Sequence, residues 1–280
     1  MPQSPPTTDA PHPDRLDLAK AARLRLALQA DGEQLFALLR DPDPDLTRSV
    51  LKNPNLGEAH LLALLKRRNI PEQLIKTMHR LPAAAASRRL MIALAGHPNT
   101  PASVLSALLP QLFLFELVTV MQLPGVSPDH KIAAERAILK RLPETELGNK
   151  ITLARRGSPA LLEALMREGE ARLVEAVLAN PRLKESGVLA FLKAPAATAE
   201  TISAVGRHQV WGNRPNLRVA MLRNRKTPLI WFTLYLPTLS SFELKNLAGS
   251  QGLTPDQLLA VRQELGNRQP SSDAQPPRLQ

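Results

Sequence analysis

The chain alternates short polar turns with Leu-rich stretches whose apolar residues recur at helical spacing. Each turn follows the same pattern: a small residue and Leu come first, then a polar residue, then Pro or a polar pair. Asn53, His97, Asn180 and Asn224 hold the same place in four copies of this pattern. The first two positions are 44 residues apart, and so are the last two. Apolar residues at this spacing predict amphipathic helices, and the recurrence predicts a stacked array of helices, an α-solenoid.

Proline sets the length of the predicted helices. Eighteen prolines lie between Pro42 and Pro255. Proline is costly inside a helix but tolerated in its first turn, so this spacing predicts helices of two to three turns. No hairpin signal appears, and no strand-like alternation persists over five residues, which predicts an all-α protein. Five of the prolines follow a Ser or Thr that we expect to be a helix N-cap: Thr100, Ser127, Ser158, Thr227 and Thr254.

Composition divides the chain into three parts. Residues 1–13 and 266–280 are rich in proline and polar residues and contain too little apolar surface to fold, so we expect disordered tails. Residues 14–265 are expected to form a single α-solenoid domain. A solenoid needs covered ends, and leucines in the helices predicted near 15–29 and 254–265 are expected to provide that cover.

The turn motifs resemble a known class of repeat. They are Asn-Pro-Asn-Leu at 53–56, His-Pro-Asn-Thr-Pro at 97–101, Asn-Pro-Arg-Leu at 180–183 and Asp-Pro-Asp-Pro-Asp-Leu at 41–46. Each resembles the leucine-rich repeat variant family and its HEAT-like relatives. The resemblance implies a right-handed superhelix of short stacked helices in two layers over about residues 32–265. The first-described member of that family carries a Cys-ligated iron–sulfur cluster. This chain has no cysteine, so that feature does not carry over.

The sequence gives no sign of enzyme chemistry. With no cysteine, disulfides, thiolate metal sites and Cys nucleophiles are excluded. There is no Gly-rich phosphate loop and no Gly-x-Ser-x-Gly turn, and the six histidines lack the spacing of a zinc motif. His97 is expected to form hydrogen bonds at a helix terminus. We therefore predict no catalytic residue, no cofactor and no metal site, and a protein that is not an enzyme.

Basic charge is concentrated in parts of the chain. The net charge is +11. Hydrophobic residues make up 44% of the chain and aromatic residues only 3% of it, so the core must be aliphatic. Residues 66–89 contain seven bases and one acid, residues 131–156 seven bases and three acids, and residues 207–226 six bases and no acid. Such segregation attracts polyanions. The alternative is that the bases cover the solvent-facing sides of helices.

A possible anion- or partner-binding ridge follows from these windows. Arg with a neighbouring Trp suits phosphate contact with base stacking, or recognition of an acidic peptide. The paired arginines of two further windows fall at the same point of the pattern, just after a Leu-rich helix. The alternative is that Trp211 packs over a junction and the arginines are solvated, pair with Glu, or complement helix dipoles. The predicted ridge is Arg67, Arg68, Arg155, Arg156, Arg207, Trp211, Arg214, Arg218, Arg223, Arg225 and Lys226.

These features predict a scaffold that binds another protein through its concave face or the basic ridge. The alternative function is sequence-independent binding of nucleic acid through backbone phosphates. No stretch reaches 18 apolar residues without charge, so no membrane span is expected. The N-terminus has neither a basic start nor an apolar run, and a cytoplasmic location is the simplest expectation.

Overall fold

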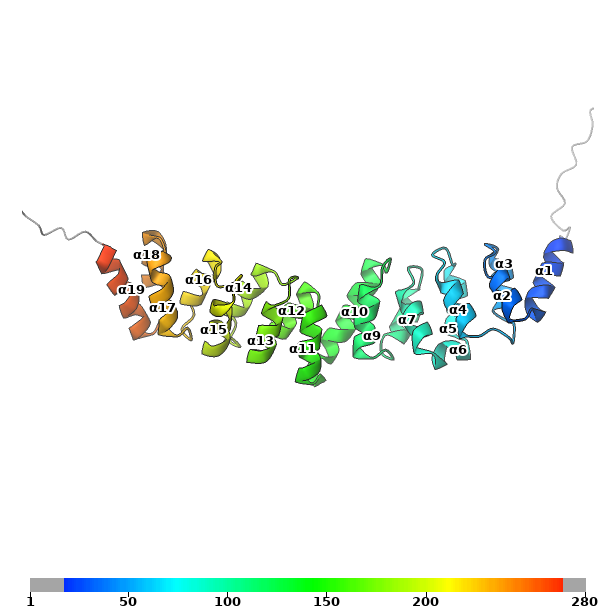
Figure 1. Ribbon diagram of the computed structural model, residues 1–280, viewed down its shortest axis with the longest axis horizontal. Coiled ribbons are helices and arrows are strands. Elements are labelled where there is room, and N and C mark those ends of the chain that lie inside the picture. The colour runs from blue at the N-terminus through cyan, green and yellow to red at the C-terminus, as the bar shows by residue number, and fades with distance from the viewer. Residues whose placement is uncertain (1–17, 269–280) are drawn as a thin grey trace, which may run out of the picture. The chain divides into compact units, whose positions relative to one another are not determined.

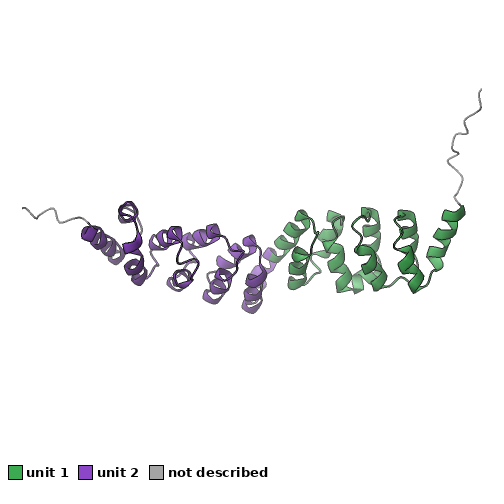
Figure 2. Ribbon diagram, turned by 45° about the horizontal axis from the view of Figure 1, so that its top comes forward, with its two compact units in different colours: residues 1–138 green, residues 139–280 purple. Residues whose placement is uncertain are grey.

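The computed structural model describes residues 18–268. This part of the chain contains nineteen α-helices, two short 3₁₀ helices and no strand, which confirms the all-α prediction. The chain divides after Ile138 into two compact units, coloured separately in Figure 2, and each is described by itself. The predicted tail at 1–13 lies outside the described residues. So does the predicted tail at 266–280, except that the last helix continues to Arg268.

Unit 1 consists of short helices in two layers (Figure 1). In one layer α2 contacts α4, α4 contacts α7, and α7 contacts α9. In the other layer α1 contacts α3, and α3 contacts α5. Helix α6 packs on α5 and α7. The helices are α1 (Leu18–Gln29), α2 (Gly32–Leu38), α3 (Pro44–Val50), α4 (Glu58–Leu65), α5 (Glu72–His79), α6 (Pro82–Ala86), α7 (Arg88–Gly96), α8 (Ala102–Leu108) and α9 (Leu114–Gln122).

Unit 2 has the same kind of packing. Helices α11, α13 and α15 contact one another in succession, as do α12, α14 and α16, and α19 packs on α17 and α18. Helix α10 (Pro128–Arg141) contains the boundary between the units. The others are α11 (Leu147–Arg156), α12 (Pro159–Met166), α13 (Ala171–Leu178), α14 (Glu185–Lys193), α15 (Ala199–Arg207), α16 (Pro215–Leu222), α17 (Leu229–Tyr235), α18 (Ser241–Ala248) and α19 (Pro255–Arg268), with 3₁₀ turns at Leu142–Glu144 and Leu236–Thr238.

The core is aliphatic, as the composition predicts, but the leucines of the first helix do not belong to it. Leu18 is 84% exposed, and Leu26 and Leu28 are also exposed, whereas Ala27 and Ala30 are fully buried. Helix α1 therefore packs on α3 through small residues rather than through a leucine face. The expectation that its leucines cover the end of the stack is wrong for these three residues.

Three of the five predicted N-caps are confirmed. The hydroxyl of Ser158 accepts from the backbone N–H of Leu161 at 3.2 Å, and Ser127 and Thr254 make the equivalent bonds. Thr100 and Thr227 do something else. Their hydroxyls are buried and donate at 2.5 Å to the carbonyl oxygens of residues in the preceding helices, Leu94 and Met221. These two threonines therefore bond to the C-terminal end of the helix before the turn and do not cap the N-terminus of the helix after it.

The four positions aligned by sequence, here called the junction residues, make one recurring set of hydrogen bonds. Asn53, His97, Asn180 and Asn224 each use one side-chain nitrogen to reach a carbonyl oxygen at the end of an earlier helix or in the turn after it. Asn53 donates to the oxygens of Ala27 and Ala30 at 2.8 and 3.1 Å. The corresponding acceptors are the carbonyls of Arg67 for His97, Ala154 for Asn180 and Leu192 for Asn224, at 2.6–2.7 Å.

The second polar atom of each junction residue stabilises its own turn. The Oδ1 atoms of Asn53, Asn180 and Asn224 accept from the backbone N–H two residues later at 2.7–2.9 Å. In the His97 copy, the Nδ1 atom accepts from the N–H of Asn99 at 3.2 Å. A carbonyl oxygen can only accept, so the Nε2 of His97 carries its hydrogen and the ring is neutral. Each junction residue thus joins a turn to the helix stacked before it, as expected for His97.

Truncation of a junction residue should destabilise the fold. Asn180 is 5% exposed, so Asn180→Ala leaves the buried carbonyl of Ala154 and the N–H of Arg182 without these partners. We expect a loss of about 1–3 kcal/mol in the free energy of unfolding, measured by urea denaturation. The control is Asn149→Ala, which truncates an exposed asparagine of the same unit and should change stability by less than about 0.5 kcal/mol. Equal effects of the two substitutions would contradict a structural role for the junction.

His97 should make the stability of the protein fall as the pH is lowered. Burial lowers the pKa of His97, and the nearby His130 acts in the same direction, while the bond to the Arg67 carbonyl opposes them. The neutral ring is therefore favoured in the folded state. Its contribution is complete above the unfolded histidine pKa of about 6.5, and is lost as the pH falls toward the lower folded pKa, at about 1.4 kcal/mol per pH unit.

His97→Asn introduces the residue found at the other three junctions and removes this titration. We expect the free energy of unfolding, measured by urea titration at pH 7.5, 6.5 and 5.5, to depend less steeply on pH than in the wild type. His79→Asn is the control, because no hydrogen bond of the described structure uses that half-buried side chain. A slope unchanged by His97→Asn would refute the assignment.

Candidate partner-binding pockets

The predicted ridge residues all lie near helix ends, where their sequence context places them. Arg67 and Arg68 follow α4 in unit 1. The other nine are in unit 2: Arg155 and Arg156 end α11, Arg207 ends α15, and the remaining six lie in or beside α16. The structure therefore groups most of the ridge around one helix of unit 2. It also separates side chains that stabilise the fold from side chains that face solvent.

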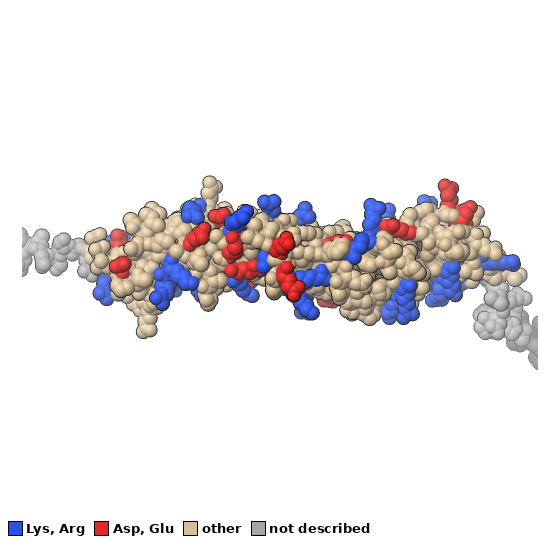
Figure 3. All heavy atoms as spheres, turned by 90° about the horizontal axis from the view of Figure 1, so that it is seen from below, with Lys and Arg blue, Asp and Glu red and all other residues tan. Residues whose placement is uncertain are grey.

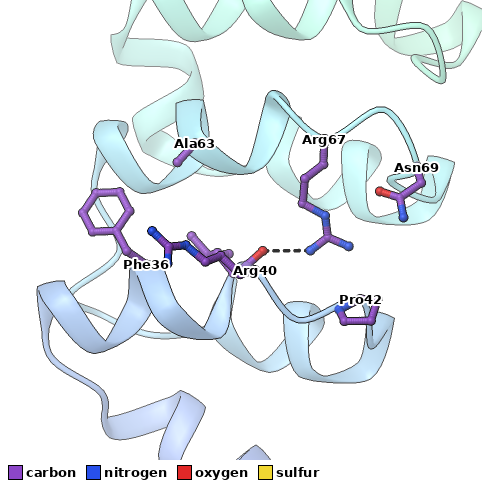
Figure 4. Close-up of a pocket in the computed structure, with 7 residues that line it drawn as sticks. Phe36, Arg40, Pro42, Ala63, Arg67 and Asn69 are labelled. Atoms are coloured by element: carbon purple, nitrogen blue, oxygen red, sulfur yellow. Dashed lines mark hydrogen bonds between the residues drawn. The ribbon is translucent and has the colours of Figure 1, made fainter.

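Arg67 belongs to the first group. Its Nη1 atom donates to the carbonyl oxygens of Leu39 and Asp41 at 2.8 and 2.7 Å, which satisfies the C-terminal end of α2. Figure 4 shows this side chain crossing one wall of a pocket of about 430 Å³, with Phe36 at the opposite side. Because its guanidinium already donates hydrogen bonds to two backbone carbonyls, Arg67 is a structural residue at the end of α2.

Trp211 and Arg218 are also part of the packing. Trp211 is 7% exposed, and its Nε1 donates to the carbonyl oxygen of Leu178 at 2.9 Å. The guanidinium of Arg218 bonds to the Gly212 carbonyl at 2.8 Å and lies 4.9 Å from the centre of the Tyr235 ring. Burial raises the pKa of Tyr235, and the charge of Arg218 opposes that shift. Trp211 thus packs over a junction, the alternative that the sequence left open.

Arg214 is neutralised by a carboxylate. Its Nη1 lies 3.4 Å from an oxygen of Glu185 on α14. Arg207, Arg223 and Arg225, by contrast, are exposed, and their side chains form no hydrogen bond or ion pair within residues 18–268. The same holds for Arg68 and Arg155. Arg156 is exposed, and its carbonyl accepts from Arg182 at 3.5 Å.

Two of these free cations line a pocket of about 420 Å³, here called the unit 2 pocket. The C-terminal ends of α14 and α16 form its walls, together with the turn after α18. Lys193, Arg223 and Arg225 line it without a side-chain partner in the described structure. Lys226 also lines it, but its Nζ is held by the carbonyl oxygens of Pro195 and Ala197 at 2.7 and 2.9 Å. No carboxylate is among the lining side chains.

A pocket of about 620 Å³ in unit 1, here called the unit 1 pocket, has the same character. It lies between the C-terminal end of α4 and the length of α7, from Arg89 in the first turn of α7 to Gly96, and is completed by the turn after α9. Lys66, Arg68 and Arg89 line it, none with a side-chain hydrogen bond or ion pair among the described residues, and again no carboxylate does.

The two pockets occupy equivalent places in the pattern of the chain. Each contains a junction residue, His97 in unit 1 and Asn224 in unit 2. In both, an alanine four residues earlier lines the wall, Ala93 or Ala220. The third wall in each case contains a glycine with positive φ: Gly125 with φ 79° and Gly252 with φ 122°. The chain therefore builds the same kind of pocket in both units.

Sequence reasoning missed three of the pocket cations. Lys66 and Arg89 lie within the basic window 66–89, so charge density alone could have included them. Lys193 lies outside all three windows, and no local signal distinguishes it from other lysines at helix ends. Its role depends on the contact between α14 and α16, which only the structure provides.

Some of the bases elsewhere on the surface are paired with carboxylates. Lys150 lies 2.7 Å from Glu168, and Arg88 forms an ion pair with Glu116 and rests on the ring of Phe113. The bond from Arg88 lowers the pKa of Glu116. Figure 3 shows Asp and Glu lying among Lys and Arg on the face that it draws. The two pockets differ from that mixed face in having no carboxylate among their lining residues.

Residues 18–268 contain neither a cluster of metal ligands nor a candidate membrane span. No cluster of three or more Asp, Glu or His side chains there is arranged to hold a metal ion. Among the described helices, none is both long and apolar enough to cross a bilayer.

A substitution at Trp211 separates its structural role from a binding role. Trp211→Phe removes the donor to the buried Leu178 carbonyl, so we expect the free energy of unfolding to fall by about 1–3 kcal/mol in urea denaturation. Arg207→Ala, which changes an exposed neighbour, should alter it by less than about 0.5 kcal/mol. A Trp211→Phe protein as stable as the wild type would instead indicate that the indole N–H is available to a ligand.

Comparison with known proteins adds no assignment to this geometry. The chain matches no protein-family model, no curated protein and no solved structure. A function must therefore be argued from the junctions and pockets themselves.

Proposed function

We propose that this protein is a non-enzymatic α-helical repeat scaffold that binds another protein. In this proposal its helices form a right-handed α-solenoid of the leucine-rich repeat variant or HEAT-like kind. The observation that carries the proposal is the pair of equivalent pockets, each lined by three cations without a partner among the described residues and by no carboxylate. Such pockets complement a partner with negatively charged side chains.

Electrostatics favours occupation of these pockets. Cations gathered around one cavity repel each other, and a bound carboxylate relieves that repulsion while gaining charge-assisted hydrogen bonds. Each exposed contact contributes little alone, because water and salt screen it. Several contacts made together in one pocket give useful affinity and electrostatic steering.

The junctions support a scaffold role through preorganisation. Each pocket includes a junction residue whose side chain is bonded to an earlier part of the stack and to its own turn. The walls are therefore fixed before a ligand arrives. A preformed site loses less conformational entropy on binding than a flexible one.

A second candidate is sequence-independent binding of nucleic acid. It is favoured by residues 201–242, which contain no acidic residue. Phosphate contacts release condensed counterions, so affinity for nucleic acid falls steeply with salt. Binding of a protein partner through mixed polar and apolar contacts should depend less on salt.

The two candidates are separated by a salt series with three labelled ligands: an acidic polypeptide, duplex DNA and single-stranded RNA. We expect the wild type to bind the polypeptide more tightly than either nucleic acid at 150 mM salt, measured by fluorescence anisotropy. Arg223→Glu/Arg225→Glu should weaken polypeptide binding at least tenfold, because it reverses two cations of the unit 2 pocket.

The control for this change of charge is Arg172→Glu/Arg262→Glu. Both residues are exposed in unit 2 and neither lines the pocket, so the net charge changes equally while the pocket is kept. The control protein should retain most of the wild-type affinity. Preference for DNA or RNA with a steep salt dependence would replace the protein-scaffold proposal with the nucleic-acid one.

A further inference from the structure

The geometry points to a specific ligand class for both pockets: a linear acidic peptide in which apolar side chains such as Leu alternate with Asp or Glu. The apolar side chain would enter the pocket between two helices, and the flanking carboxylates would meet the cations at its rim. This inference rests on the proposed scaffold function and deepens it, since it names what the scaffold recognises and where.

The pocket walls provide the apolar half of the site. In unit 1 Leu62, Leu65 and Leu123 line the cavity, and in unit 2 Ala194 and Pro195 do so, over a Leu192 side chain that is buried. Ala93 and Ala220 leave room between the helices where a larger residue would fill the space. A ligand with charges alone would leave these apolar surfaces in water, whereas burying one leucine side chain stabilises a complex by about 1.5–3 kcal/mol.

The cations provide the half of the site that recognises acidic side chains. Lys66, Arg68 and Arg89 in unit 1, and Lys193, Arg223 and Arg225 in unit 2, are not engaged by other described side chains or carbonyls. Lys226 shows the contrast, because its ammonium group already satisfies two carbonyls. The free cations are therefore the groups that a ligand can reach without breaking an existing bond.

Two features favour carboxylates over a phosphate backbone. The unit 2 pocket is formed by C-terminal helix ends, whose carbonyls carry partial negative charge, whereas phosphates are typically held by helix N-termini. Neither pocket is lined by Phe, Tyr or Trp, and the ring of His97 in the unit 1 pocket is buried, so neither offers an exposed ring on which a base could stack. Trp211, the candidate stacking residue of the sequence, is buried and bonded elsewhere.

The test uses three ligands of equal charge on the intact protein. Two are peptides, one alternating Glu and Leu and one with each Leu replaced by Ser, and the third is a single-stranded oligonucleotide. Fluorescence anisotropy at 150 mM salt should show at least tenfold tighter binding of the Glu–Leu peptide than of the other two. Arg223→Glu/Arg225→Glu and, in unit 1, Lys66→Glu/Arg89→Glu should each weaken it, and Arg172→Glu/Arg262→Glu should not.

The place where the peptide binds is tested by disulfide tethering. The chain has no cysteine, so an introduced cysteine is the only thiol of the protein. Ala194→Cys places a thiol on the unit 2 pocket wall, and Ala160→Cys places one on an exposed site away from it. A Glu–Leu peptide with an activated cysteine should capture Ala194→Cys at least tenfold faster. Circular dichroism and urea denaturation confirm that every variant is folded before it is compared.

The outcomes separate this inference from the scaffold function. Binding of the Glu–Leu peptide that ignores the pocket substitutions and shows equal tethering rates overturns the pocket assignment, and it leaves only the binding of an acidic polypeptide at another surface of the protein. Equal affinity for the Ser-containing peptide overturns the apolar half of the inference. Tighter binding of the oligonucleotide overturns both proposals in favour of nucleic acid.

Discussion

The hydrogen bond from an Asn or His side chain to the end of an earlier helix is the interaction on which the packing of both units depends. Short helices leave a large share of their carbonyls without intrahelical partners, because every C-terminus has four. Where helices stack, water cannot reach all of these groups. Asn180, at 5% exposure, satisfies the Ala154 carbonyl and an N–H of its own turn at once. One buried side chain thus fixes both the turn and its distance from the neighbouring helix, which determines the walls of the pockets.

The sequence predicted those features whose chemistry is local. The junction residues were recognisable because an Asn before Pro or a polar pair has few conformations that satisfy its side chain. Thr100 and Thr227 were misassigned because a threonine before proline can cap the helix that follows or close the one before. The burial of the side chain decides between these two roles. Thr100 and Thr227 are both buried, and both bond to the preceding helix. The prediction that the leucines of α1 are buried was wrong for a related reason. The carbonyls of Ala27 and Ala30 accept hydrogen bonds from Asn53, so the side of α1 that carries Ala27 faces α3.

The candidate site was predictable as a density of charge but not as a set of free side chains. Arg67 and Arg218 stand in basic windows like Arg68 and Arg223, and nothing in the local sequence tells them apart. Arg67 reaches a carbonyl 28 residues earlier in the chain, and Arg218 folds back onto the Gly212 carbonyl and the Tyr235 ring. Whether a cation is available to a ligand is therefore a property of the stacked structure. Lys193 is the converse case, because packing of α14 on α16 makes an unremarkable lysine part of a pocket.

Stabilisation of helix ends does not by itself account for the pocket cations. A base near a helix C-terminus contributes about 0.3–1 kcal/mol through the dipole, and Lys226 shows the stronger form of this role by bonding to two carbonyls. Arg223 and Arg225 lie beside it without such bonds, in a stretch of sequence where no acid occurs between residues 201 and 242. Arg214 has Glu185 as its counterion, so the fold can supply one when stability is the only requirement. Leaving three cations unneutralised around an apolar cavity, at equivalent places in both units, lowers stability and increases affinity for an acidic ligand, which is the balance expected of a binding surface.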